Sequence, residues 1–198
     1  MKHIILIGGS GYIGTHLMEK WMQYDPEVKF TSISRNGRPE TLSENLANNQ
    51  RIEWVSADIF KIDSYLSKLP DHADVIVDLV GTATAKEAKD FEKLNVEPVK
   101  IMVNLMDELS ISKGCYISGR MGMPATNKLF IASKRKGEAL AQASKKEIGI
   151  VRPSLVYGDR PGVGAMVFFV KAIGLFKREL QPIKIDQLTD QIIQICKS

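Results

Sequence analysis

The first fourteen residues constrain the fold of this chain more than any other segment. An unbroken apolar run from Ile4 to Ile7 leads directly into Gly8, and Gly11 and Gly14 follow at intervals of three. The run is short and has no polar alternation, which predicts a parallel strand buried on both faces. The glycines permit a sharp turn and close packing of a following helix. Free N–H groups where that helix begins, near Tyr12, favour an anion such as a dinucleotide pyrophosphate.

Strand-like and helical patterns alternate along the rest of the chain. Strand-like runs lie at residues 4–7, 28–33, 51–55, 75–80, 114–117 and 148–151, and helical patterns lie at 12–24, 62–69, 91–109 and 128–146. This alternation predicts an α/β fold, a doubly wound parallel sheet with right-handed crossovers. We expect a dinucleotide-binding domain over residues 1–160. A small C-terminal extension, a substrate or lid segment packed on that domain, would cover residues 161–198.

The residues after the second strand favour a phosphorylated dinucleotide. About twenty residues after the last motif glycine, a site for NAD would place an acidic side chain on the ribose hydroxyls. Ser34 and Arg35 stand there instead, and Arg38 follows. A hydroxyl and a guanidinium suit a 2′-phosphate, which a carboxylate would repel. The sequence therefore favours NADP(H) over NAD(H); the alternative is that both arginines are merely solvated loop residues.

The next two strand ends supply further candidates for cofactor binding. Asp58 can accept a hydrogen bond from an adenine amino group, and Ile59 can cover the ring. Val80 and Gly81 follow the fourth strand, where a small residue would let the backbone approach a ribose, and Ile13 belongs to the pyrophosphate site. Two structural alternatives remain open, because Asp58 can instead cap a helix and Gly81 can simply permit a turn.

Motifs spread over almost the whole chain resemble those of the short-chain dehydrogenases/reductases. They are Gly8-Gly-Ser-Gly-Tyr-Ile-Gly14, Ala57-Asp-Ile59, Asn95-Val96, Tyr116-Ile-Ser118, Ser133-Lys134 with Gly137-Glu138, and Val151-Arg-Pro-Ser-Leu-Val-Tyr-Gly158. In order and spacing they resemble the extended or atypical branch that contains epimerases and dehydratases. Within it, the chain looks most like a subgroup that includes the nucleotide-binding accessory subunit of respiratory complex I. The resemblance implies an NAD(P)-binding Rossmann-like fold.

The same resemblance points to an altered active site. Family enzymes use a serine or threonine after the fifth strand and a Tyr-x-x-x-Lys pair on the next helix. By this correspondence Ser118 and Lys134 match their positions, with Lys134 holding the nicotinamide ribose, and Phe130 occupies the tyrosine position. A phenyl ring cannot exchange a proton, and positioned acid–base catalysis is typically worth about 10²–10⁴-fold.

Two functional interpretations therefore remain open. The first is an NADP(H)-dependent oxidoreductase or epimerase/dehydratase-type enzyme of unusual mechanism. The second is a non-catalytic nucleotide-binding protein that senses redox state or stabilises a complex. The intact glycine turn argues against a scaffold that has lost its cofactor.

Composition argues against several other classes of protein. The chain has 198 residues and a formal charge of +4, and no group of its cysteines and histidines has the spacing of metal ligands. No recognised nucleic-acid module accompanies the basic residues, and the longest apolar run, about eight residues, is too short to span a bilayer. We expect a cytoplasmic protein with a small-molecule substrate and no metal or nucleic acid. Its C-terminal segment could also meet a protein partner.

Overall fold

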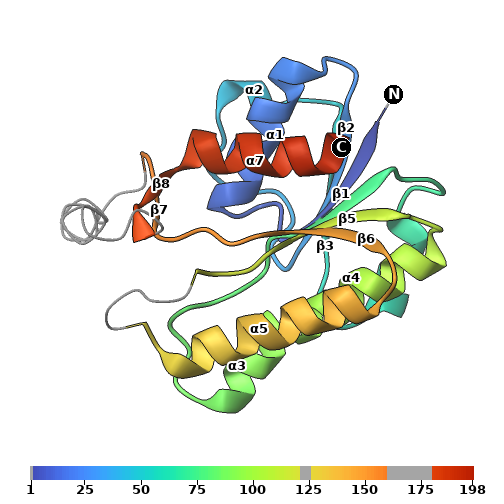
Figure 1. The fold of residues 1–198 in the computed structure, drawn as a ribbon. Helices are drawn as coiled ribbons and strands as arrows, with labels where there is room; N and C mark the ends of the chain where they lie inside the picture. Colours follow the sequence, from blue (N-terminus) through green and yellow to red (C-terminus); the bar gives the residue numbers. More distant parts are fainter. Residues whose placement is uncertain (1, 121–125, 160–179) are drawn as a thin grey trace.

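The apolar runs of the sequence form the six parallel strands of one sheet (Figure 1). The computed structural model describes residues 2–120, 126–159 and 180–198. The strands are β1 (His3–Ile7), β2 (Lys29–Ser34), β3 (Ile52–Ser56), β4 (Val75–Asp78), β5 (Lys113–Ile117) and β6 (Glu147–Val151). Their order across the sheet is β3-β2-β1-β4-β5-β6. This order confirms the predicted doubly wound fold, and it reverses between β1 and β4, where such sheets bind ligands.

Helices cover both faces of the sheet, as Figure 1 shows. One face carries α1 (Tyr12–Tyr24), α2 (Glu44–Ala47) and α7 (Ile185–Lys197); the other carries α3 (Ala88–Asn95), α4 (Glu97–Glu108) and α5 (Lys128–Ala143). Successive residues of β1 point to opposite faces, so Ile4 and Leu6 enter the core beneath α1 and α7, whereas Ile5 and Ile7 enter the other core. All four side chains are fully buried. This two-sided burial is why β1 is an unbroken apolar run.

Two of the predicted helices differ from the structure. The segment 62–69 forms two short 3₁₀ turns, η1 (Ile62–Ser64) and η2 (Leu66–Lys68), because a segment of this length gains little from helix propagation. The predicted helix at 91–109 is broken at Val96, which separates α3 from α4. Pro98, in the first turn of α4, explains the break, since proline lacks an N–H donor and would clash with the preceding turn inside a helix.

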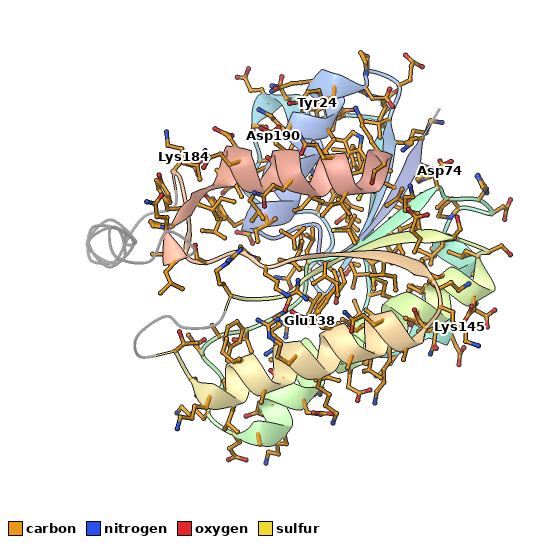
Figure 2. The ribbon with its side chains drawn as sticks, viewed as in Figure 1. Tyr24, Asp74, Glu138, Lys145, Lys184 and Asp190 are labelled. Carbon is orange, nitrogen blue, oxygen red and sulfur yellow. The ribbon has the colours of Figure 1, made fainter. Side chains whose placement is uncertain are left out.

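The C-terminal helix packs against α1 and lies over β5 and β6. Leu188 and Ile192 of α7 belong to the same buried cluster as Trp21 of α1. At the surface, the Tyr24 hydroxyl donates to the Asp190 carboxylate at 2.9 Å, a contact that can be followed in Figure 2. Before α7, two short strands pair in parallel, β7 (Val156–Tyr157) and β8 (Ile183–Lys184). Residues 161–179 of the predicted extension lie outside the described ranges.

Candidate cofactor site

The glycine turn after β1 leaves the N-terminus of α1 open. Gly8 has a φ of +83°, which favours glycine, and its N–H donates to the Ile33 carbonyl at 2.8 Å. A Cβ placed on Gly14 would lie 2.3 Å from the Gly9 carbonyl oxygen, so only glycine lets α1 pack this closely on the turn. Gly11 is exposed at the N-cap of α1, where no side chain of a described residue caps the helix, and the first turn of α1 holds no acidic residue. These features fit an anion.

Tyr12 and Ile13 begin α1 and are both half-buried. Each packs against the core beneath α1 and α7. The Tyr12 ring lies 4.5 Å from the His16 ring, measured between centroids, and a hydrogen bond from Tyr12 lowers the pKa of the Asp159 carboxyl. The Tyr12 side chain therefore ties the start of α1 to the segment after β7. Its contribution to an anion site rests on its backbone.

The end of β4 connects the glycine turn to Lys134. A Cβ on Gly8 would lie 2.9 Å from Cγ2 of Val80, and a Cβ on Gly81 would lie 2.7 Å from Nζ of Lys134. Gly8, the pair Val80 and Gly81, and Lys134 lie far apart in the sequence, and these close approaches make them one line of neighbours. This line crosses the point between β1 and β4 where the strand order reverses.

Lys134 is buried on the inner side of α5, with 4% of its surface exposed. Its Nζ donates to the Ile117 carbonyl at 2.8 Å and lies 4.9 Å from the centre of the Tyr116 ring. Burial lowers the pKa of Lys134 to about 8, and the nearby Asp78 carboxylate opposes this shift. A lysine held in this way is suited to binding a hydroxyl group that reaches the end of β4.

Asp78, the last residue of β4, was not among the residues predicted from sequence. It is fully buried. Its Oδ1 accepts from the Val80 N–H at 2.9 Å, whereas its Oδ2 is buried without a hydrogen-bond partner among the described residues. Burial raises the pKa of Asp78 to about 6, against the opposing effects of Lys134 and of the Val80 N–H. A single acidic residue inside the apolar run 75–80 was the signal that could have identified it.

The residues after β2 form a tight turn, in which the three predicted phosphate contacts have different environments. The Ser34 hydroxyl donates to the Gly37 carbonyl at 3.0 Å, so this hydroxyl is engaged within the turn. Arg35 is exposed, while its own carbonyl accepts from the Ser56 hydroxyl at 3.0 Å. Arg38 is also exposed, but its guanidinium donates to the Ala47 carbonyl. Arg35 is therefore better placed than Ser34 or Arg38 to meet a phosphate.

Asp58 and Ile59 follow β3 and take different environments. Asp58 is exposed, and its Oδ1 accepts from the Phe60 N–H at 3.2 Å within a local turn. It does not cap the next helix, which was the structural alternative, because the N-cap of η1 is Lys61. Its second carboxylate oxygen leaves capacity for a further donor. Ile59 is 6% exposed and packs in the core on the α4 side of the sheet.

The residues after β5 are bound to one another. Ser118 is 4% exposed, and its hydroxyl donates to the buried carboxylate of Glu138 on α5. Phe130 is half-buried, and a Cβ on Gly119 would lie 2.9 Å from its ring. The Phe130 ring also lies 6.5 Å from the Phe91 ring, measured between centroids. At this end of the sheet, Phe130 offers no proton and the Ser118 proton is already engaged.

Comparison with known proteins identifies the family. A model described as the NAD dependent epimerase/dehydratase family matches residues 4–180, nearly nine-tenths of the chain. The chain therefore belongs to this family, and the resemblance to atypical short-chain dehydrogenases/reductases seen in its motifs is confirmed.

Two curated relatives are distant. The chain is 26% identical over 121 residues to the decarboxylating sterol-4-alpha-carboxylate 3-dehydrogenase of Candida albicans, an alignment covering 60% of this chain and 34% of that enzyme. It therefore spans about a third of the dehydrogenase. It is 22% identical over 221 residues to MIOREX complex component 2 of Saccharomyces cerevisiae, covering 87% of this chain and 79% of that protein.

Solved structures share the fold. A UDP-glucuronic acid 4-epimerase from Bacillus cereus, in complex with NAD, matches 99% of this chain and 74% of its own with a TM-score of 0.72 and 19% identity. An ADP-L-glycero-D-manno-heptose-6-epimerase from Helicobacter pylori matches 100% of this chain and 74% of its own with a TM-score of 0.74 and 16% identity.

Among the described residues of this chain, every helix is too short or too polar to cross a bilayer.

Proposed function

We propose that this chain binds NADP(H) and acts as an oxidoreductase whose reaction does not depend on a tyrosine of α5. The observation that carries the proposal is the line of neighbours from Gly8 through Val80 and Gly81 to Lys134. It joins an open helix N-terminus, suited to a pyrophosphate, to a buried ammonium group suited to a ribose hydroxyl. A dinucleotide has both groups in one molecule.

The rest of the proposed cofactor site follows the strand ends. Gly8, Gly11, Tyr12, Ile13 and Gly14 would surround the pyrophosphate. The adenosine half would meet Asp58, and Ile59 would support this end of the site from the core. Arg35 supports the preference for NADP(H), because it is exposed where an NAD site would hold a carboxylate. Arg38 and Ser34 would assist only if they released the Ala47 and Gly37 carbonyls.

The proposed chemistry is hydride transfer to an acceptor that takes its proton from water. The bound cofactor would supply the hydride. Lys134 would hold and orient the ribose, and Phe130, at the family's tyrosine position, would pack beside the reacting groups without exchanging a proton. A flavin, a quinone or an enone would suit such a site. Simple ketones would not, because their oxygen must be protonated as the hydride arrives. Sugar nucleotides would not either, because a sugar hydroxyl must lose its proton to a base as its hydride leaves.

The test is oxidation of NADPH by the purified protein with each class of acceptor. We expect turnover with a quinone, a flavin or an enone, and none with simple ketones. Ketone reduction at rates ordinary for the family would contradict the proposal, because another proton donor would then have to act at this site. The Lys134→Met variant should lose NADPH affinity and turnover together, since it removes the proposed ribose contact.

A second candidate function, nucleotide binding without turnover, is favoured by one observation. The Ser118 hydroxyl is buried and donates to Glu138, so the serine at the family's catalytic position is already engaged within the protein. NADPH binding with no oxidation by any of these acceptors would support this candidate. A redox sensor or a stabiliser of a complex would then be the better description, and a yeast relative is named as a complex component. A protein partner would be expected at the C-terminal segment.

A further inference from the structure

Two arginines pair with one buried carboxylate beyond the ends of β5 and β6, and a third is fastened beside them. We call Arg120, Arg135 and Arg152 the arginine cluster. Arg152 donates to both oxygens of Glu138, from Nε at 2.9 Å and from Nη2 at 2.8 Å. Arg135 pairs with the same carboxylate and donates to the Gly119 carbonyl at 2.5 Å. Figure 2 shows Glu138 on the side of α5 that faces the sheet.

Arg120 joins the cluster through the backbone. Its Nε donates to the Arg152 carbonyl at 3.3 Å, and its N–H donates to the Pro153 carbonyl at 2.9 Å. The segment after β5 is thus fastened to the segment after β6. This arrangement keeps the Arg120 guanidinium close to the other two without giving it a share of the Glu138 carboxylate.

The arginine cluster carries more positive charge than its surroundings balance. In the described part of the chain, Glu138 is the carboxylate that pairs with Arg135 and Arg152. Three positive charges and one negative charge leave an excess of two. Burial, together with the charges of Arg152 and Arg120, lowers the pKa of Arg135. The Arg152 side chain is 41% exposed, so part of this charge reaches solvent.

The arginine cluster also adjoins the proposed reaction site. Gly119 precedes Arg120, and a Cβ on Gly119 would lie 2.9 Å from the Phe130 ring and 3.9 Å from Cγ of Lys134. Parallel α/β sheets bind their ligands beyond the carboxyl ends of the strands. A molecule that reached Phe130 and Lys134 from this side would therefore pass the arginine cluster.

We propose that the arginine cluster binds an oxyanion, a carboxylate or a phosphate, on the substrate that meets the cofactor beside Lys134. The inference rests on the proposed function and adds to it the chemical class of the substrate. Guanidinium groups suit this task because their donors match the two oxygens of a carboxylate or phosphate. Arg120 and Arg152 are the contacts, whereas Arg135 positions Glu138 and holds the Gly119 carbonyl.

The test is NMR detection of the arginine Nε–H signals of the full chain during titration with inorganic phosphate and, separately, with acetate. We expect saturable shifts at Arg120 and Arg152. Shifts with phosphate alone would indicate a phosphorylated substrate, and shifts with acetate alone would indicate a substrate that carries a carboxylate. Shifts with both probes would indicate that the cluster accepts any small oxyanion. Each of these results supports the proposal. Arg120→Gln should weaken binding on the order of tenfold, the loss expected for one charge-assisted hydrogen bond. Arg120→Lys should retain part of the affinity.

A matched control is Arg51→Gln, which removes a guanidinium bound to Asn49 near β3 and should leave the titrations unchanged. The proposal is overturned if neither probe gives a saturable shift, or if Arg120→Gln binds as the native protein does. Each titration is run without and with NADPH. Anion binding without NADPH binding would contradict only the proposed function, and NADPH binding without anion binding would contradict only this inference.

Discussion

The two ends of the proposed site differ in whether their polar side chains already have partners within the protein. Around the glycine turn, side chains are absent or point outwards: Gly11 and Arg35 are exposed, and α1 has no capping side chain. Beyond β5, polar groups are paired with one another, as Ser118 is with Glu138 and Lys134 with the Ile117 carbonyl. In the first arrangement no described side chain caps the start of α1, whereas in the second the polar side chains already have partners within the protein. Membership of the family therefore predicts cofactor binding at this site more directly than it predicts the reaction.

The largest effect is expected at the glycine turn, from Gly14→Ala. The new methyl group would lie 2.3 Å from the Gly9 carbonyl oxygen, so backbone would have to move. We expect a loss of about 3 kcal/mol or more in the free energy of unfolding, the upper end of the cost of overpacking. Urea denaturation measures this loss of stability. Gly11→Ala is the matched control, because its new Cβ would meet only the Gly8 carbonyl oxygen at 3.4 Å; it should cost under about 1 kcal/mol. Equal stabilities of the two variants would contradict the geometry of the turn.

The next effect concerns pH and the buried end of β4. The folded pKa of Asp78 is raised to about 6 from 3.8, so the folded state holds this proton more tightly than the unfolded chain does. Its stabilising effect is present at low pH and is lost as pH rises from about 4 to 6. Asp78→Asn removes this titration. We therefore expect the variant to gain about 2 kcal/mol relative to the native protein between pH 4 and pH 7.

Urea denaturation at pH 4, 5, 6 and 7 provides the measurement for Asp78. Parallel stability curves for the two proteins would mean that the carboxyl group is not buried as described.

A smaller effect is expected for Arg35→Ala, which addresses the open end of the site. Loss of a charge-assisted contact should weaken NADPH binding about tenfold, close to 1.4 kcal/mol, and leave NADH binding unchanged. Isothermal titration calorimetry with both cofactors measures the difference. Arg38→Ala should have the lesser effect, because the Arg38 guanidinium already donates to the Ala47 carbonyl. If Arg35→Ala weakens both cofactors equally, Arg35 does not recognise the 2′-phosphate.

The smallest effect is expected for Phe130→Tyr, which addresses the opposite end. The variant would place a phenol on the same helix face as Lys134, four residues away. We expect slow ketone reduction that rises above the background of the native protein, measured by NADPH oxidation. The native protein is the control. Ketone reduction by the native protein at the same rate would show that the missing phenol does not distinguish the two ends of the site.

The fold was predictable because local and long-range requirements agree in the sequence. The β1 run, the glycines and the first helix each point to one buried parallel strand followed by a tight turn. The helix prediction over 91–109 was wrong because hydrophobic periodicity continues through Val96, although Pro98 marks a new start. The prediction of one helix over 62–69 was also wrong, because this short segment forms two 3₁₀ turns.

The hydrogen-bond partners of the site residues were less predictable from the sequence than the identities of those residues. The motifs named Lys134 and Ser118, but not that Ser118 donates to Glu138 or that Lys134 lies beside Asp78. These contacts join segments distant in the chain, so their geometry depends on how α5 packs on the sheet. Arg135 appeared in the sequence as an ordinary basic residue, and Arg152 stood in a family motif without a role assigned to it. Only the fold gathers them around one carboxylate.

The central claim is that the cofactor end is open and built for NADP(H). Calorimetric titration of the native protein with NADPH and with NADH tests it most directly. We predict that NADPH binds at least about tenfold more tightly, because one charge-assisted contact to the 2′-phosphate is worth that much. Equal affinities for the two cofactors, or no binding of either, would contradict the account.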